Sequence, residues 1–556
     1  MYNIGLDNIE IILSYYDIFE GEMPDLVEEI KSLNMHKAIS IICELIAAKD
    51  YKIKVNTVFS LEMDVPYEMA LKKMLCEIQA TSPEDLNANP LLRKDKHIIS
   101  LQMLLILLKK LFIYGDYSTL YMDDYEINLD DYKKIVKLQL IIAEKMNDEF
   151  EIDKVDMSHF LYGTYHVNYD RNVANEFIRT YYMFEKIGKD KYNFEEDIQG
   201  EYKDYYGDFT AKYGYTPTQY IFILFWELSV YFQYEKRLTF HSIWREVGEI
   251  YGSTGLKAIA AKVISDLSSD AIGYQEWAEE SEKRQWDFQK FIEFPFIMDK
   301  KGRYISISEY TLKNTLFEKL FWKVRECYSI SDKNAMAFYG RLYERYIQDL
   351  TNNAIYPDSM YQYIPEFKFG KQEKRSSDAY IRCRKNLLIV EAKGYSILIN
   401  SLVKNEDINK NNEKLYVNPI LQADQRFCEI EQQMDIFDGI ETVYIVSVTM
   451  DSVSAVPKYL KEIYEKILDK RQSKKLKYFL NLNIEEYEML MYLVESQKDA
   501  FSVLKEYFER RNIIPFVTYL NHKAGVRILR TSFMTSLYNE AITGLMNMYD
   551  FKDKNT

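Results

Sequence analysis

The residues best suited to chemistry in this chain lie between Asp378 and Lys393, where two carboxylates and a lysine interrupt β-prone sequence. Asp378 opens one short segment, and Glu391 and Lys393 end the apolar run that begins at Leu387. Carboxylate oxygens are the ligands that Mg²⁺ and Mn²⁺ prefer in proteins. A lysine amine beside a metal-bound water can orient or deprotonate that water. We therefore expect a site that holds a hard divalent cation and directs a water at a substrate.

The spacing of these residues predicts how two strands would bring them together. Residues 387–393 form a short apolar run that is typical of a buried strand. Side chains alternate between the two faces of a strand, so Glu391 and Lys393 should share one face. A tight reversal between the two segments would bring Asp378 and Glu391 to the same end of a hairpin. The backbone carbonyl of Ala392 is a further expected metal ligand.

This pattern resembles the PD-(D/E)xK nuclease superfamily, in which an acid, a variable gap and a Glu-x-Lys strand form the site. The resemblance covers residues 334–450 and implies an α-β-β-β-α-β core around a small mixed sheet. It also implies phosphodiester hydrolysis, most often of DNA, with Mg²⁺ or Mn²⁺ as the cofactor. Asp378 and Glu391 would bind the metal, and Lys393 would be catalytic. Ser377 precedes the acid where the family has proline.

Members of this superfamily often add an acid from the first helix, and Glu344 is the candidate here. It lies at the rim of the apolar stripe of a helix expected at residues 334–352. A carboxylate at such a rim can face a cleft or solvent, and both readings stay open. Gln422 and Gln425 lie on a helical stretch at 418–437, where some exonuclease-type members carry a glutamine.

The fold class that we expect is multidomain, with a large all-α region followed by an α/β restriction-endonuclease-like core and a helical extension. Apolar residues recur at helical spacing through much of the N-terminal half, whereas β-prone runs cluster after residue 360. The expected parts are an α-helical sensor, partner-binding or regulatory region (1–293), a connecting hairpin and helix (294–333), the nuclease core (334–456) and a mostly helical C-terminal extension (457–556).

Short motifs of this kind also arise by chance, and the PD-(D/E)xK residue pattern occurs a second time in this chain. Pro24 and Asp25 precede Glu29-Ile30-Lys31, but three intervening residues cannot form a strand, a turn and a second strand. The alternatives for the match at 378–393 are a core strand that happens to end in charges and a decayed nuclease fold kept for binding.

The charge of the chain is uneven. The formal net charge of the chain is −15. Residues 1–333 have a net charge of −16, whereas residues 457–530 have a net charge of +5. Basic patches are typical of proteins that bind phosphates, although each basic run is also typical of a solvated face. The candidate nucleic-acid contacts are Lys371, Lys374, Arg375, Arg384, Lys385, Lys474 and Lys475.

Other sequence features bear on energy use and on the compartment in which the protein works. The sequence has no Gly-x4-Gly-Lys-Ser/Thr phosphate loop, which argues against intrinsic ATP hydrolysis. Its five cysteines form no Cys-x-x-Cys pair, and the N-terminus has no signal-peptide pattern, so we expect a cytoplasmic protein with reduced thiols and no membrane segment.

These observations favour a regulated nuclease effector, with bacterial anti-phage defence as the expected setting. The helical half would then bind a protein partner or a phage-derived trigger, and a homo-oligomer is compatible with such an enzyme. An RNA-cutting effector of the same fold, a restriction endonuclease and an inactive binding or scaffold protein remain as alternatives.

Overall fold

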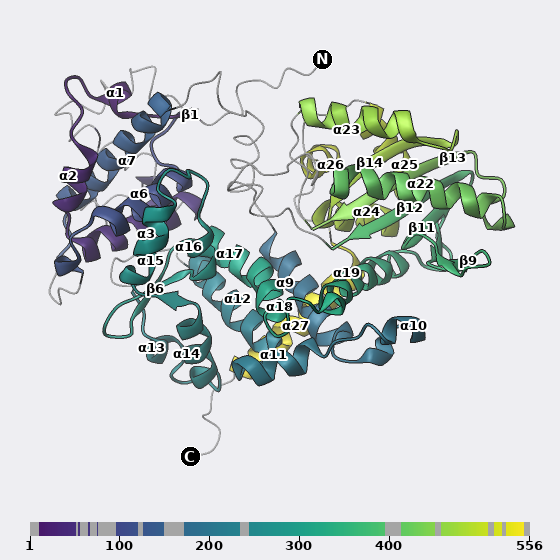
Figure 1. Ribbon diagram of the computed structural model, residues 1–556, viewed down its shortest axis with the longest axis horizontal. Coiled ribbons are helices and arrows are strands. Elements are labelled where there is room, and N and C mark those ends of the chain that lie inside the picture. Colours follow the sequence, from purple (N-terminus) through teal and green to yellow (C-terminus); the bar gives the residue numbers. More distant parts are fainter. Residues whose placement is uncertain are drawn as a thin grey trace. The chain divides into compact units, whose positions relative to one another are not determined.

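The chain folds into two compact units, and each is assembled from separate stretches of sequence (Figure 1). The computed structural model describes residues 11–51, 54–55, 65–66, 75, 96–120, 126–149, 172–233, 244–394, 413–450, 457–509, 516–524 and 530–549. The first unit comprises residues 1–157, 219–322 and 546–556, and the second comprises 158–218 and 323–545.

This division differs from the boundaries expected from the sequence. Residues 158–218 lie within the expected helical region 1–293 but belong to the second unit. Most of the segment expected to connect the two parts, 294–322, belongs to the first unit instead. The expected boundaries followed changes in local composition, whereas the units are defined by long-range packing.

The first unit is mostly helical. Its helix α6 (Leu101–Tyr114) begins at Ser100, whose hydroxyl accepts a hydrogen bond from the Met103 amide, and apolar side chains cover nearly its whole circumference. A helix that is apolar all round is buried, and α6 accordingly packs against α3 (Met35–Tyr51), α7 (Leu129–Glu149) and α15 (Ala271–Glu280).

The first unit also contains further helices and several short strands. Its helices are α1 (Tyr15–Ile18), α2 (Leu26–Lys31), α12 (Pro217–Gln233), α13 (Val247–Tyr251), α14 (Lys257–Asp266), α16 (Gln289–Glu293), α17 (Glu309–Asn314) and α18 (Leu320–Arg325). Its strands are β1 (Ile11–Ile12), β2 (Lys54–Val55), β3 (Val65–Pro66), β4 (Lys96–His97), β5 (Ser268–Ser269), β6 (Phe296–Met298) and β7 (Tyr304–Ser306). The hairpin expected around residues 301–302 is present as β6 and β7, which β5 extends to a three-stranded sheet.

The second unit is built on a five-stranded mixed sheet with the strand order β14-β13-β12-β11-β8. Strands β12, β13 and β14 run parallel, and β11 is antiparallel to both of its neighbours. The strands are β8 (Gln362–Pro365), β11 (Ala379–Cys383), β12 (Asn386–Lys393), β13 (Thr442–Thr449) and β14 (Leu476–Asn483). Strand β14 falls in the expected helical extension 457–556, so that part of the chain completes the sheet.

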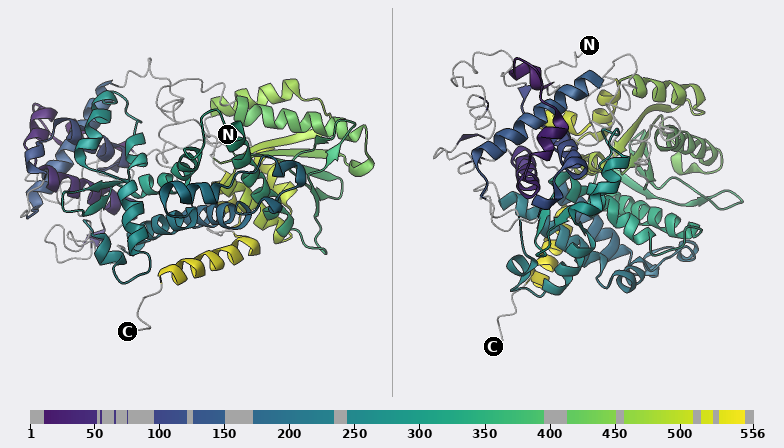
Figure 2. Two further views of the ribbon diagram at one scale, coloured as in Figure 1. Left: turned by 60° about the horizontal axis from the view of Figure 1, so that its bottom comes forward. Right: turned by 60° about the vertical axis from the view of Figure 1, so that its left-hand side comes forward.

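Helices cover both faces of this sheet (Figures 1 and 2). Leu387 and Ile389 of β12 pack in one apolar core with Ile420 and Phe427 of α22 (Asn418–Glu431). The same core includes Ile467 of α23 (Pro457–Lys470). Two further helices, α19 (Lys333–Asn353) and α24 (Ile484–Glu495), pack against the sheet and against each other.

Further helices and two short strands complete the second unit. They are α9 (Val173–Tyr181), α10 (Glu196–Gln199), α11 (Tyr205–Tyr213), β9 (Lys368–Phe369), β10 (Lys374–Arg375), α25 (Ala500–Glu509), α26 (Phe516–Ala524) and α27 (Ser532–Tyr549), the last of which continues into the first unit. From α19 to β13, the helices and the strands of the five-stranded sheet follow the expected order, and the short strands β9 and β10 form an additional pair between β8 and β11. Within the described part of the chain, no helix combines the length and the apolar character needed to span a membrane.

Candidate active site

The β11–β12 hairpin brings Asp378 and Glu391 to one end of the sheet, as the spacing predicted. A two-residue turn joins the strands, and Arg384 adopts a left-handed φ of 56° in it. The register pairs Ala379 with Val390, so Asp378, which directly precedes β11, lies opposite Glu391. Asp378 Oδ2 accepts a hydrogen bond of 2.6 Å from the Ala392 amide, which fixes the carboxylate against the end of β12.

Glu391 is buried at 1% exposure and has a basic partner on each oxygen. Arg426 Nη1 lies 2.7 Å from Oε1, and Lys393 Nζ lies 3.4 Å from Oε2. The contact with Lys393 agrees with the expectation that the two side chains share a face. Burial alone would lower the pKa of Arg426, but the Glu391 and Asp378 carboxylates outweigh burial and raise it.

The sequence analysis missed Arg426, although the sequence carries a signal for it. Arg426 follows Ala423 by three residues and precedes Ile430 by four, which places it on the apolar stripe of α22. A lone arginine on a core-facing stripe needs a buried partner. The two glutamines considered on this helix point elsewhere, because Gln422 is exposed and Gln425 donates to Glu429 at 3.0 Å.

Glu344 of α19 contributes charge to the same site. The pKa of Asp378 is raised well above its ordinary value, first by burial and then by the charges of Glu391 and Glu344. Lys393 and the Ala392 amide oppose this rise. Glu344 also forms an ion pair with Arg341, whose Nη1 lies 2.9 Å from Glu344 Oε2. The Glu344 side chain is 24% exposed, so this rim carboxylate is only partly solvated, and a catalytic role stays a prediction.

The donor atoms at this site suit a hard cation. No three Asp, Glu, His or Cys side chains of the described residues form a ready-made metal cluster. Two carboxylates, Asp378 and Glu391, nevertheless lie opposite each other with like-charge repulsion that a dication would relieve. N–H and C=O of one strand residue point to the same side, so the Ala392 carbonyl lies on the Asp378 side of β12. Such oxygen donors fit Mg²⁺ or Mn²⁺, which keep several waters.

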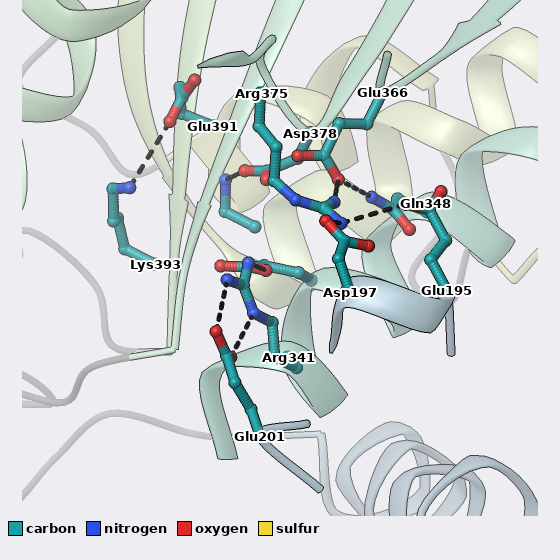
Figure 3. Close-up of polar contacts among 12 residues, drawn as sticks. Glu195, Asp197, Glu201, Arg341, Gln348, Glu366, Arg375, Asp378, Glu391 and Lys393 are labelled. Atoms are coloured by element: carbon teal, nitrogen blue, oxygen red, sulfur yellow. Dashed lines mark hydrogen bonds and ion pairs between the residues drawn. The ribbon is translucent and has the colours of Figure 1, made fainter. Parts of the chain in front are cut away.

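A second set of charges lies beside these residues (Figure 3). Arg375 bridges Glu366 at 2.9 Å to Asp197 at 2.7 Å and Glu195 at 3.0 Å. Gln348 of α19 donates to the same Glu366 oxygen at 3.3 Å. Burial raises the pKa of Glu366, and Arg375 opposes this rise.

Arg341 forms a similar bridge. It joins Glu344 of the site to Glu201, whose carboxylate lies 3.0 Å from Arg341 Nε. Burial lowers the pKa of Arg341, but Glu201 and Glu344 outweigh burial and raise it. Three of the five acids that pair with these two arginines were not anticipated from the sequence near the motif, because Glu195, Asp197 and Glu201 precede the motif by well over a hundred residues.

Most of the basic residues expected to contact nucleic acid make ion pairs within the protein. Lys374 pairs with Glu429, Lys385 with Glu441 and Lys475 with Glu431. Arg375 has the three acidic partners described above. The other three candidates, Lys371, Arg384 and Lys474, are exposed. Their part in nucleic-acid binding stays a prediction.

A polar row extends the site across the sheet. The parallel register aligns Glu391 with Ser447 and Ser447 with Asn481. The Ser447 hydroxyl lies 2.7 Å from the Asn481 side-chain oxygen. The carboxyl ends of β12, β13 and β14 therefore present polar groups where the preceding residues are apolar, and ligands commonly bind at that edge of an α/β sheet.

Comparisons with known proteins add little to this picture. No protein-family model matches the chain, and no curated protein does. Among solved structures, the chain is similar to the small subunit of the heterodimeric restriction endonuclease R.BspD6I. The similarity covers 42% of this chain and 97% of that subunit, at 10% sequence identity and a TM-score of 0.20. So low a score carries no argument, and a functional assignment must rest on the residues of the site.

Proposed function

We propose that this chain is a metal-dependent nuclease of the PD-(D/E)xK type that hydrolyses phosphodiester bonds, with DNA as its substrate. One observation carries the proposal: Asp378 and Glu391 lie opposite each other at the end of a buried hairpin, with Lys393 beside Glu391. The order of helices and strands from α19 to β13 supports a restriction-endonuclease-like core. The choice of DNA follows the resemblance stated for the motif.

Each residue of the site has a distinct part in this proposal. Asp378, Glu391 and the Ala392 carbonyl would hold Mg²⁺ or Mn²⁺, which when bound polarises a phosphoryl oxygen and acidifies a water. Lys393 is partly exposed, with a side-chain exposure of 24%, so its amine can reach both Glu391 and a water at the surface. There it orients the attacking water and neutralises charge that develops on the phosphate.

Arg426 holds Glu391 in place. Its side chain is 34% exposed while its partner is 1% exposed, so the guanidinium spans from the buried carboxylate to the surface. A buried carboxylate without a cationic partner is strongly destabilised. Arg426 therefore holds the Glu391 carboxylate in a fixed orientation before the metal binds.

A cleavage assay tests this proposal. Supercoiled plasmid, single-stranded DNA and RNA are incubated with the protein and Mg²⁺ or Mn²⁺, with EDTA as the metal-free control. We expect metal-dependent cleavage of DNA that Lys393→Ala abolishes. Lys461→Ala is the matched control, because Lys461 is an exposed lysine of α23 that is not among the candidate nucleic-acid contacts and whose partner is Glu465 at 3.7 Å.

The outcomes separate the alternatives. If only RNA is cleaved, the substrate is RNA and not DNA. Discrete plasmid fragments would indicate a restriction endonuclease. Equal activity of the wild type and Lys393→Ala would refute the catalytic role of Lys393, and activity in EDTA would refute the need for a metal. A role in anti-phage defence stays a prediction, which a plaque assay comparing wild type with Lys393→Ala would check.

A further inference from the structure

Two arginines, Arg341 and Arg375, lie between the carboxylates of the candidate site and an acidic segment at residues 195–201, here called the acidic segment (Figure 3). Each arginine has one partner on the site side and at least one on the segment side. Arg341 pairs with Glu344 and Glu201, and Arg375 pairs with Glu366 and two acids of the segment. Lys368 also contacts the segment, at 3.0 Å from Asp197.

The chemistry of these contacts matches that of phosphate binding. The guanidinium fork pairs with carboxylate and phosphate oxygens in the same way, and arginine is the residue most used to recognise both. The carboxylates of the segment therefore occupy donor positions that phosphate oxygens can take.

The two sides of each arginine differ in burial. The site-side partners Glu366 and Glu344 have side-chain exposures of 11% and 24%. The segment-side partners are more open, at 60% for Glu195, 41% for Asp197 and 33% for Glu201. Exposed ion pairs are individually weak and are screened by salt. The arginines thus stay anchored beside the site when the segment-side contacts break.

We propose that the acidic segment competes with nucleic acid for Arg341 and Arg375, which bind substrate phosphates once the segment is displaced. This inference rests on the proposed nuclease function and adds its regulation. The substrate class is a polyanion with regularly spaced phosphates, which can replace several carboxylates at once. In the resting protein, the segment lowers affinity for nucleic acid beside the metal-binding carboxylates.

A binding experiment tests the competition. The triple variant Glu195→Gln, Asp197→Asn and Glu201→Gln is made in a Lys393→Ala background, so that Mg²⁺ can be present without cleavage. Affinity for a fluorescent DNA duplex is measured by anisotropy over a range of salt concentrations. We expect binding to tighten about tenfold, equal to about 1.4 kcal/mol. We also expect the salt dependence to become steeper by about two to three charges, because the two arginines and Lys368, whose partner is Asp197, become free for phosphates.

Two controls separate competition from a general change of charge. Glu196→Gln changes the same charge in the same segment, but Glu196 is not an ion-pair partner of either arginine among the described residues. It should leave affinity nearly unchanged, in contrast to Asp197→Asn. In an Arg375→Ala background, Glu195→Gln should lose its effect, because Glu195 and Arg375 act on the same contact.

The outcomes distinguish this inference from the nuclease proposal. Metal-dependent cleavage by the wild type, with equal duplex affinity for the wild type and the triple variant, would overturn the competition and leave the nuclease. Equal gains from Glu196→Gln and Asp197→Asn would also overturn it. Tighter binding by the triple variant, with no cleavage by any form that retains Lys393, would support the competition and overturn the nuclease reaction.

Discussion

Replacing Asp378 by asparagine should stabilise the metal-free protein while abolishing metal binding and cleavage. The substitution removes one charge from a crowded set that includes Glu391 and Glu344, and like charges at such sites are costly. The asparagine oxygen can still accept the 2.6 Å hydrogen bond from the Ala392 amide. We expect the free energy of unfolding in EDTA to rise by about 1–2 kcal/mol, the usual gain when a strained functional residue is replaced.

Asp378→Ala provides the comparison at the same position. It removes the same charge but leaves the Ala392 amide without its partner, and an unpaired buried N–H costs about 1–3 kcal/mol. The alanine variant should therefore be less stable than the asparagine variant by about that amount. Both variants should lose cleavage, but only the asparagine variant should combine this loss of activity with a gain in stability.

The gain should also depend on pH. Because the pKa of Asp378 is raised in the folded protein, this group favours the folded state at acidic pH and loses that contribution as the pH rises. The advantage of asparagine should therefore be greatest at neutral and alkaline pH and vanish at acidic pH, where the carboxyl is protonated in both folded and unfolded states.

Urea unfolding with EDTA or Mg²⁺ measures all of these effects. Mg²⁺ at a hundred times its Kd should stabilise the wild type by about 2.7 kcal/mol and should not stabilise either variant. The reasoning is refuted if Asp378→Asn is less stable than the wild type in EDTA at neutral pH. It is also refuted if Mg²⁺ stabilises that variant as much as the wild type.

Three further predictions concern separate parts of the molecule. Arg426→Ala should lower the free energy of unfolding by about 2–3 kcal/mol, because it leaves the buried Glu391 carboxylate with the longer contact to Lys393 as its remaining basic contact. Urea unfolding measures this loss, with the surface variant Lys385→Ala as the control. Burial raises the pKa of Glu44 to about 8, so the free energy of unfolding should fall by about 1.4 kcal/mol for each pH unit between pH 5 and 7. Glu44→Gln should flatten this dependence on pH in melting experiments, and an unchanged slope would contradict the prediction. Ile389→Ala should cost about 2–5 kcal/mol by leaving a cavity in the core between β12 and α22, and Ile389→Val about 0.5–1.5 kcal/mol, so equal losses in urea would count against the packing described.

The strand pair at the site could be predicted because its signals are local. The alternation of Glu391 and Lys393, the apolar run before them and the position of Asp378 all lie within sixteen residues, and the observed register agrees with them. Helix α22 and strand β13 were expected near their observed positions for the same reason.

The rest of the site could not be predicted because it depends on tertiary packing. Arg426 faces Glu391 only because α22 crosses that face of the sheet. Arg375 was expected to contact nucleic acid, but it pairs with acids 178 and 180 residues away in sequence. Nothing in the composition of residues 195–201 indicates which surface they contact.

The distance in sequence between the acidic segment and its arginines has a consequence for biosynthesis. Residues 195–201 leave the ribosome before Arg341, Arg375 and every residue of the catalytic motif, because chains emerge from the N-terminus onward. Strand β14, at residues 476–483, completes the sheet only much later. Under the proposed competition, the newly made candidate site therefore assembles in the presence of the acidic segment, whereas a fragment that begins at residue 323 would contain the motif without that segment.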